Sequence, residues 1–378
     1  MSDALPDSST ELRSTLDADG TITLSLRRAA ITPPGEDQVV VRVEAAPINP
    51  SDLGGLFAGA DLRDATAVER DGEPGVAASV PAVDSALAAR VGTPIPVGNE
   101  GGGTVVAAGD SPAAQALLGK VVGFLSGNAY AEYRTLHVSQ CLAMPDGTSA
   151  EAAAAPFVNP LTALGMVDTM RLEGHSALVH TVGASNLGLM LNRLCLTDGV
   201  PLVNIVRRPE QAEVLRAQGA EHVCDSSAPT FLDDLTAALR GTGATIAFDA
   251  IGGGELAGTL LTCMERVASE STEGYSRYGS DTLKQVYLYG NLDRGPTVLH
   301  RDFGMSWSIG GWLLIPFLAR VGDERANELR QRVATEITTT FASTYGMRLS
   351  LTEALDPEMV RRYGRMATGD KALITPRP

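Results

Sequence analysis

A turn near the middle of the chain carries the first residue types suited to chemistry. In "SALVHTVGASNLGLMLNRL", Gly183 and Gly188 occupy the outer positions of the dinucleotide fingerprint G-x-G-x-x-G, and Ser185 replaces its middle glycine. The turn follows an apolar, strand-like run and opens a helix-like one, which is the setting that gives this motif meaning. The start of such a helix offers amides and a positive dipole to a phosphate. Taken alone, the motif fits an ordinary strand-to-helix turn equally well.

Two arginines follow the next apolar run, "LVNIV". In dinucleotide-binding folds, an acidic residue near the end of this second strand binds the ribose hydroxyls of NAD. Here the run ends in Arg207 and Arg208, and the first acid is Glu210. Two guanidinium groups suit the extra 2′-phosphate of NADP through charge-assisted hydrogen bonds. A solvated pair at a strand end is the alternative, but the position of the pair favours NADP.

The elements that must position these residues fall into two parts. Up to about Ala150 the segments are β-rich, and the region from 60 to 92 is an excursion with one short helix expected near Asp84 to Val91. Strand-like and helix-like segments then alternate, which predicts a parallel sheet wound on both faces. The C-terminal stretch returns to short β-like segments with one helix. We therefore predict an α/β chain with a discontinuous first domain, 1–158 with 335–378, and a second domain at 159–334.

Composition narrows the class of protein. The chain has 378 residues and a net charge of −15, which argues against a nucleic-acid partner because phosphate backbones need a basic face. The polar, acidic N-terminus does not look like a signal peptide, and no apolar run is long enough to cross a bilayer, so a cytoplasmic protein is expected. Four scattered cysteines without a CxxC pair indicate buried thiols rather than a disulfide or a metal site.

An ordered set of motifs extends over most of the chain: "VRVEAAPINPSDL", "PVGNEGGGTVVAAG", "AYAEY", "PFVNPLTALGMV", "VHTVGASNLG", "LRAQGAEHV", "FDAIGGGE", "VYLYGN" and "GDKALITP". This set resembles the zinc-independent branch of the medium-chain dehydrogenase/reductase superfamily, which contains NADPH:quinone oxidoreductases and enoyl-thioester reductases. The resemblance implies a GroES-like β domain joined to a Rossmann domain, with NADPH in the cleft between them. Relatives are commonly dimers, so a homodimer is expected.

The resemblance also bears on zinc. Zinc-dependent relatives place a cysteine at or near Asn49 and a histidine at Asn99, and they often add a lobe of closely spaced cysteines. This chain has neither ligand and cannot build the lobe. Since zinc needs three or four suitable ligands, we predict no metal.

Residue by residue, the resemblance implies the following roles. Asn49 lines the substrate side of the nicotinamide, although capping the turn before Pro50 is the alternative. Thr162 touches the nicotinamide end of the cofactor. Lys371 matches a lysine that closes on the cofactor, with an exposed terminal charge as the alternative. The remaining predicted cofactor contacts are Gly183, Ala184, Ser185, Asn186 and Leu187 at the pyrophosphate, and Ala250, Ile251, Gly252, Tyr289, Gly290, Asn291 and Leu292 along the ribose and nicotinamide.

The acceptor is less well defined by the sequence. Relatives that reduce enoyl thioesters typically carry a tyrosine shortly after "INPSD", whereas the first tyrosine here is Tyr130. Tyr130 is our candidate for a catalytic proton donor, with strand packing as the alternative for it and for Tyr133. The missing tyrosine favours a quinone or a related conjugated carbonyl over an enoyl thioester. An NADPH-binding protein with little catalysis is a third hypothesis, motivated by the same loss and by insertions at 60–92 and 267–284.

Overall fold

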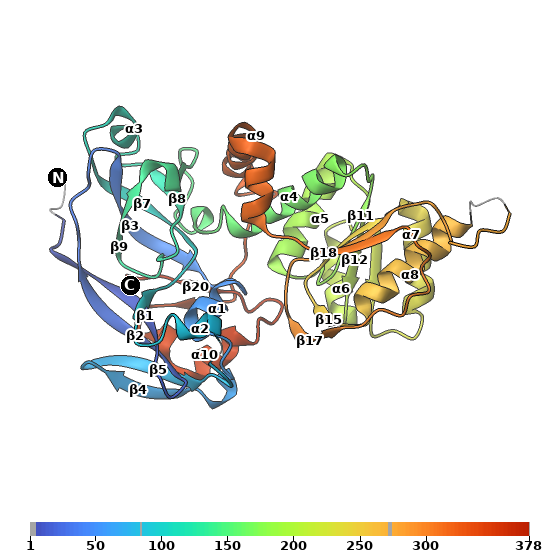
Figure 1. The fold of residues 1–378 in the computed structure, drawn as a ribbon. Helices are drawn as coiled ribbons and strands as arrows, with labels where there is room; N and C mark the ends of the chain where they lie inside the picture. The colour runs from blue at the N-terminus through green and yellow to red at the C-terminus, as the bar shows by residue number, and fades with distance from the viewer. Residues whose placement is uncertain (1–4, 84, 271–273, 378) are drawn as a thin grey trace. The chain divides into compact units, whose positions relative to one another are not determined.

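The computed structural model describes residues 5–83, 85–270 and 274–377, and it divides into two compact units (Figure 1). Unit 1 comprises Met1–Val158 and Arg330–Pro378, and unit 2 comprises Asn159–Leu329. The predicted domains, 1–158 with 335–378 and 159–334, stay a prediction. The predicted return at residue 335 lies later than the structural division, inside a helix, because the sequence pattern there is continuously helical.

Unit 1 consists of a five-stranded sheet, in the order β4-β5-β2-β1-β6, and a seven-stranded sheet, in the order β10-β8-β7-β3-β20-β19 with β9 also paired to β3. The central strand β3 has partners on both edges and is largely buried, which explains its nearly continuous apolar sequence "QVVVRVEAAP". The C-terminal segment completes this sheet, because β20 pairs with the end of β3. The strands are β1 (Ser8–Leu16), β2 (Thr21–Ala30), β3 (Gln38–Pro47), β4 (Thr66–Arg70), β5 (Glu73–Ser79), β6 (Ile95–Pro96), β7 (Glu100–Ala108), β8 (Val121–Leu125), β9 (Tyr133–His137), β10 (Cys141–Ala143), β19 (Met347–Leu349) and β20 (Ala372–Ile374).

Short helices join these strands. They are α1 (Asp52–Phe57), α2 (Ser85–Ala88), α3 (Pro112–Gln115) and α10 (Pro357–Gly364), with 3-10 turns η1 (Leu62–Asp64), η2 (Val138–Gln140), η3 (Ala152–Ala154) and η4 (Glu353–Leu355). The core between the sheets is built from fully buried aliphatic and aromatic side chains of β1, β2, β3, β8 and β20. Burial of this apolar surface is the main favourable term in folding of the unit.

The excursion at 60–92 contains a hairpin that the sequence analysis did not anticipate. Strands β4 and β5 pair antiparallel through a two-residue turn at Asp71 and Gly72, whose φ angles are +56° and +80°. Asp-Gly favours this left-handed hairpin turn, so the signal was present in "ERDGEP". The helix expected near Asp84 to Val91 is found as α2, while Asp84 itself lies outside the described residues.

Unit 2 confirms the predicted parallel sheet with helices around it (Figure 1). All strand pairs of the order β13-β12-β11-β14-β16-β18 are parallel. From β11 the next strands in the sequence, β12 and β13, add on one side of the sheet, and from β14 the next strands, β16 and β18, add on the other side. The carboxyl ends of β11 and β14 therefore flank a topological switch point, which is where ligands bind in such sheets. The elements are α4 (Val158–Leu172), β11 (Leu178–His180), α5 (Asn186–Asp198), β12 (Leu202–Val206), α6 (Pro209–Ala217), β13 (His222–Asp225), α7 (Phe231–Thr242), β14 (Ile246–Asp249), β15 (Gly252–Gly254), α8 (Leu256–Ser269), β16 (Lys284–Leu288), β17 (Asp293–Thr297), β18 (Trp307–Gly311) and α9 (Leu314–Glu336).

Candidate functional site

The glycine turn joins β11 to α5 at the carboxyl edge of the unit 2 sheet. The Gly183 amide donates to the Ile205 carbonyl of β12 at 2.8 Å, which extends the strand pairing into the turn. A Cβ on Gly188 would lie 2.2 Å from the Gly183 carbonyl oxygen, and one on Gly183 would lie 2.9 Å from Asn204 Oδ1. Both positions therefore require glycine, because the turn packs closely against Asn204 and against its own backbone.

Ser185 is the N-cap of α5. Its Oγ accepts a hydrogen bond from the Gly188 amide at 3.0 Å. A serine in place of the middle glycine thus satisfies one amide of the helix start, while its own hydroxyl hydrogen remains a donor. Ser185 consequently does more than replace glycine, because it fixes the first turn of the helix that would face a phosphate.

Val182, just before the turn, adopts a left-handed backbone conformation with φ +53°. This conformation is costly for a β-branched residue, by roughly 1–2 kcal/mol. Hydrogen bonds on both sides hold it, from Thr181 N to Phe248 O at 3.1 Å and from Ser185 N to Val182 O at 2.8 Å. The strain lies at the point where the chain turns from the sheet into the glycine turn.

A buried carboxylate organises the neighbouring turn after β14. Asp249 is fully buried, and its Oδ1 accepts from Thr181 Oγ1 and from Ile251 N, both at 2.9 Å. Asp249 Oδ2 accepts from Gly252 N at 3.1 Å, and Thr181 Oγ1 accepts from Ala250 N at 2.9 Å. Asp249 and Thr181 were missed in the sequence, although an acid ending the apolar run "TIAFD" was the available signal.

The structure brings the two other predicted loops of unit 2 together. A Cβ on Gly290 would lie 2.6 Å from the Ala250 carbonyl oxygen, and the Leu292 amide donates to that oxygen at 3.2 Å. The loop at 289–292 therefore lies directly against the loop at 250–252. Both follow strands that neighbour each other in the sheet, as the predicted contact with one extended ligand requires.

His180 and Tyr289 form a buried pair at this edge. Their rings stack with centroids 5.7 Å apart, and His180 Nε2 lies 2.7 Å from the Tyr289 hydroxyl. Burial lowers the pKa of His180 to about 3, so the imidazole is neutral. Burial also raises the pKa of Tyr289. His180 Nδ1 is buried and has no hydrogen-bond partner within the described part of the chain.

Arg207 and Arg208 are exposed at the end of β12, next to the glycine turn. Neither guanidinium makes a hydrogen bond or an ion pair with a described residue, although the Arg207 backbone amide donates to Gln211 Oε1 at 3.2 Å. Their charge is therefore available to a ligand. Thr162, by contrast, is a buried residue of α4, and its predicted cofactor contact stays a prediction.

Unit 1 contains a separate buried polar cluster around Asn49. Asn49 Nδ2 donates to Glu100 Oε1 at 2.9 Å, and the Asn49 amide donates to Asp52 Oδ2 at 2.8 Å. Asp52 Oδ1 accepts from the Asn99 amide at 2.8 Å, and Glu100 Oε2 accepts from the amide of Phe157 at 2.9 Å. Among the described residues, no group of three or more His, Cys, Asp or Glu side chains could hold a metal ion.

Lys371 belongs to this cluster. The residue is half-buried and its Nζ atom is fully buried, without a hydrogen-bond partner among the described residues, so the alternative of an exposed terminal charge is wrong. Burial lowers the pKa of Lys371 to about 8, and the charges of Glu100 and Asp52 oppose that shift. Burial raises the pKa of Asp52 to about 7, although hydrogen bonds from two backbone amides lower it. Burial also raises the pKa of Glu100, although the charge of Lys371 lowers it. Glu100 was not singled out in the sequence.

Tyr130 has the environment of a packing residue. Its side chain is fully buried, its hydroxyl donates to the Pro47 carbonyl at 3.0 Å, and its ring fills the space beside Gly98. Burial raises its pKa well above the ordinary value. Because the hydroxyl is already committed inside the core of unit 1, these contacts do not support the predicted role of proton donor. Tyr133 instead accepts a hydrogen bond from Arg377 at 2.7 Å.

Comparison with known proteins adds sequence relatives for part of the chain. No family model matches. The synaptic vesicle membrane protein VAT-1 homolog of Rattus norvegicus is 28% identical over 233 residues, which is 61% of this chain and 50% of that protein. A quinone oxidoreductase of Pseudomonas aeruginosa is 29% identical over 171 residues, 44% of this chain and 52% of that protein. The chain thus matches about half the length of these curated relatives.

Solved structures match nearly the whole chain. A proposed NADPH:quinone reductase from Mesorhizobium loti superposes with a TM-score of 0.73 at 26% identity, covering 99% of this chain and 100% of that one. In sequence and fold the chain is similar to quinone reductases and enoyl reductases, which is consistent with the medium-chain dehydrogenase/reductase superfamily. Its fold is shared by a mycobacterial protein complexed with NADPH, at a TM-score of 0.65, 20% identity and coverage of 97% and 100%. It is also shared by the CurK enoyl reductase, at a TM-score of 0.65, 15% identity and coverage of 97% and 99%.

Within this superfamily fold, unit 1 is the GroES-like domain and unit 2 the Rossmann domain, as predicted. The glycine turn, the arginine pair and the loops at 250–252 and 289–292 all lie at the carboxyl edge of the Rossmann sheet. None of the described helices is long and apolar enough to cross a membrane.

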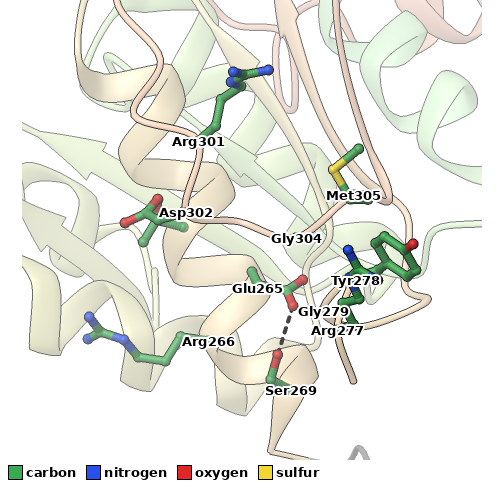
Figure 2. A pocket seen from close by; sticks show the side chains of 11 residues that line it. Glu265, Arg266, Ser269, Arg277, Tyr278, Gly279, Arg301, Asp302, Gly304 and Met305 are labelled. Carbon is green, nitrogen blue, oxygen red and sulfur yellow. Dashed lines mark hydrogen bonds between the residues drawn. The ribbon is translucent and has the colours of Figure 1, made fainter. Parts of the chain in front are cut away.

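A hollow of about 630 Å³ lies at the opposite, amino edge of the Rossmann sheet, between the end of α8 and the segments that precede β16 and β18 (Figure 2). Its arginine side chains do not converge, since those of Arg266 and Arg301 point away from the central Glu265 carboxylate in Figure 2. Glu265 is instead saturated from within the protein. It accepts from Lys284 Nζ, from Ser280 Oγ and Ser280 N at 2.7 Å each, and from Ser269 Oγ at 2.8 Å. We therefore interpret this region as a structural clasp for the insertion at 267–284, whose residues 271–273 lie outside the described part.

Proposed function

We propose that the chain is an NADPH-dependent, zinc-free oxidoreductase that reduces quinones or related conjugated carbonyls. The observation that carries the proposal is the pair of unpartnered arginines, Arg207 and Arg208, beside a glycine turn at the switch point of a Rossmann sheet. The likeness to a proposed NADPH:quinone reductase and to a quinone oxidoreductase supports the same cofactor and acceptor class.

The residues present fit a dinucleotide. A side chain on Gly183 would collide with Asn204 and one on Gly188 with the Gly183 backbone, so this turn requires both glycines. Backbone amides, the Ser185 hydroxyl and the start of α5 would bind the pyrophosphate. Arg207 and Arg208 would bind the 2′-phosphate. The loops at 250–252 and 289–292 would hold the ribose and the nicotinamide, and His180 Nδ1 is a buried polar atom still in need of a partner there.

When bound, the reduced nicotinamide supplies a hydride to the acceptor. The chain's own task is then to orient the acceptor and to stabilise the negative charge that develops on its oxygen. In unit 1 the residues suited to this are Asn49, held by Glu100, and the Lys371 ammonium.

The proposed absence of zinc follows from the same cluster. Asn49 and Asn99 stand where zinc-dependent relatives have ligands, and carboxamides are poor zinc ligands compared with thiolate and imidazole. The Asn49 side chain donates to Glu100, and Asn99 Nδ2 donates to Ser51 Oγ at 3.1 Å. Both amides are therefore engaged within the protein. A metal analysis of the purified protein that found one zinc per chain would contradict this part of the proposal.

The arginine pair provides the sharpest test of the cofactor. Changing both Arg207 and Arg208 to Ala should raise the Kd for NADPH about 10- to 100-fold, because two charge-assisted hydrogen bonds are lost, and should leave the Kd for NADH unchanged. Arg216→Ala, which removes an exposed arginine from α6, is the matched control. Fluorescence titration measures both constants. A wild-type preference for NADH, or equal weakening of both cofactors, would refute the assignment.

An acceptor panel tests the substrate class. With NADPH bound, quinones or small conjugated enones should be turned over faster than crotonyl-CoA, because no tyrosine follows "INPSD". Faster turnover of crotonyl-CoA would favour the enoyl-thioester reductase. Tight NADPH binding without turnover of any acceptor would favour a binding protein with little catalysis.

We also propose that the chain forms a homodimer. Strand β18 is an edge of the Rossmann sheet, and the neighbouring side chains of Met305, Leu313 and Ile315 are 71%, 67% and 63% exposed. An unpaired edge beside exposed apolar side chains favours pairing with a second copy. Light scattering after chromatography would decide, and a monomer at micromolar concentration would contradict the proposal.

A further inference from the structure

Lysine is rare in this chain, which makes the place of each one informative. The sequence contains three, Lys120, Lys284 and Lys371, against a large excess of arginine. Lys120 is exposed, and Lys284 is fully buried and bonded to Glu265 and Ser280. Lys371 differs from both, because its ammonium nitrogen is buried and makes no hydrogen bond with any described residue.

The carboxylates near Lys371 are bound to other donors. Glu100 accepts from Asn49 Nδ2 and from the amides of Phe157 and Val158, at 2.9–3.0 Å. Asp52 accepts from two backbone amides, as described above. These hydrogen bonds hold both carboxylates in place. The carboxylates therefore attract the Lys371 ammonium electrostatically but accept no hydrogen bond from it.

The ammonium also has an aromatic neighbour. Lys371 Nζ lies 5.6 Å from the centre of the Tyr345 ring, in the range of a cation–π contact, which stabilises the charge but uses none of its three N–H donors. Burying an ammonium whose donors are all unused is unfavourable unless a ligand takes them up. A negatively charged or strongly accepting oxygen is the chemistry that such a group recognises.

We propose that Lys371 donates the proton to the acceptor oxygen that becomes negatively charged when the hydride is transferred. This inference rests on the proposed function. The acceptor gains two electrons with the hydride and is left as an oxyanion; one Nζ–H bond of Lys371 then breaks and an O–H bond forms. The N–H bonding pair stays on Nζ as a neutral amine, which regains a proton from water.

The surroundings of Lys371 tune it for this step. Burial lowers its pKa to about 8, and Glu100 on β7 together with Asp52 on α1 keeps it from falling further. The group is therefore protonated at neutral pH and yet acidic enough to release its proton, which is the condition for efficient general acid catalysis. The other titratable groups of the cluster are Tyr345, which lies under the ammonium, and Tyr130, which lies beside Asp52. Both remain neutral, because burial raises the pKa of each.

The first test reads the proton on Lys371 directly, without cofactor. Labelling with lysine carrying ¹³C at Cε gives three side-chain signals, which Lys→Met variants assign one by one. The Lys371 signal should titrate near pH 8, well below the ordinary lysine value of about 10.4. A Lys371 signal that titrates above pH 10 would overturn the proposal.

The second test separates proton donation from cofactor binding. Lys371→Met should lower kcat by about 10²- to 10⁴-fold and abolish the fall of kcat above pH 8. Any rise in the Kd for NADPH, measured separately, reports the predicted contact of Lys371 with the cofactor. Lys371→Arg, which keeps the charge but holds its proton too firmly, should bind NADPH normally and remain slow. Lys120→Met is the control and should match the wild type.

The other outcomes distinguish failure of proton donation by Lys371 from failure of the proposed function. An active wild type whose Lys371→Met variant keeps its kcat, or loses only NADPH affinity, would overturn proton donation and leave the proposed function intact. A wild type that binds no NADPH or reduces no acceptor would overturn the proposed function and this inference with it. Circular dichroism and hydrogen exchange of the β7 amides show whether the variants are folded.

Discussion

The two units each bury a lysine next to a glutamate, and they treat the charge in opposite ways. In the Rossmann domain, Lys284 donates to Glu265 and to Ser280 Oγ, the latter at 3.0 Å, and Glu265 is saturated by further donors. In the GroES-like domain, Lys371 lies near Glu100 but makes no hydrogen bond to it or to any other described residue.

This difference is the one expected between a structural pair and the functional pair that we propose. A buried charge is tolerated when hydrogen-bond partners satisfy it, as they do for Glu265. Two glycines with positive φ, Gly279 and Gly304, pack against this carboxylate. Lys371 keeps its donors free at a cost to stability. Such a cost is typical of functional sites, where the surrounding structure holds a group ready for a ligand.

The largest expected effect is on stability, and it should differ between the two lysines. Lys284→Met should destabilise the Rossmann domain by about 3–5 kcal/mol, because it leaves the Glu265 carboxylate buried without its cation. Lys371→Met should change the stability of the GroES-like domain by no more than about 1 kcal/mol, because the lost attraction is offset by relief of an unsatisfied burial. Hydrogen exchange of β16 and β7 amides in urea reports each domain separately.

Lys120→Met serves as the baseline for this experiment, because an exposed lysine should contribute within about 0.5 kcal/mol. Equal destabilisation by Lys284→Met and Lys371→Met would contradict the proposed difference between the two lysines. It would mean that Lys371 is held by native contacts as firmly as Lys284.

A second difference should appear in the dependence of stability on pH. Burial raises the pKa of Asp52 to about 7, so its contribution to folding is fully present below about pH 3.8 and is lost as the pH rises through 7. For Glu265, burial alone would raise the pKa, but hydrogen bonds from Lys284 and Ser280 outweigh it and lower the pKa below 4.5. Its contribution is therefore present above pH 4.5 and is lost as the pH falls through the lowered pKa.

The GroES-like domain should thus lose stability between pH 4 and 7, in the range where the Rossmann domain gains or holds it. Hydrogen exchange of the same amides at pH 4, 5.5 and 7 measures this. Asp52→Asn should flatten the profile of the GroES-like domain without altering that of the Rossmann domain. Parallel profiles in the two domains would contradict the assignment.

Much of the fold was predictable because it depends on local patterns. The alternation of apolar strands with helices predicted the parallel sheet, and the glycine turn and the arginine pair were found because their spacing from strand ends is a local property. The Asp71–Gly72 hairpin was also encoded locally and was overlooked. The predicted second boundary, before residue 335, falls within α9, which is helical on both sides of it.

The polar clusters were harder to predict because they join residues that are distant in the sequence. Nothing near Lys371 indicates that β20 pairs with β3 and brings it beside Glu100 and Asp52. Asp249 and Thr181 likewise meet only through the pairing of β14 with β11. Tyr130 could be identified as polar and aromatic, but the partner of its hydroxyl, the Pro47 carbonyl, is a matter of tertiary packing.

The smallest expected effect is on the pKa of Lys371, and it tests whether the charge of Glu100 contributes to that pKa. Glu100→Gln keeps the size of the side chain and an oxygen acceptor but removes the charge that raises the pKa of Lys371. The pKa of Lys371 should therefore fall below 8, by about one pH unit, since the opposing charge of Asp52 remains. The ¹³C signal of Lys371 measures it, and Glu265→Gln, which acts on the other lysine, should leave that signal in place. An unchanged Lys371 titration in Glu100→Gln would show that Asp52, and not Glu100, is the carboxylate that raises the pKa of Lys371. Asp52 would then replace Glu100 as the functional partner of Lys371.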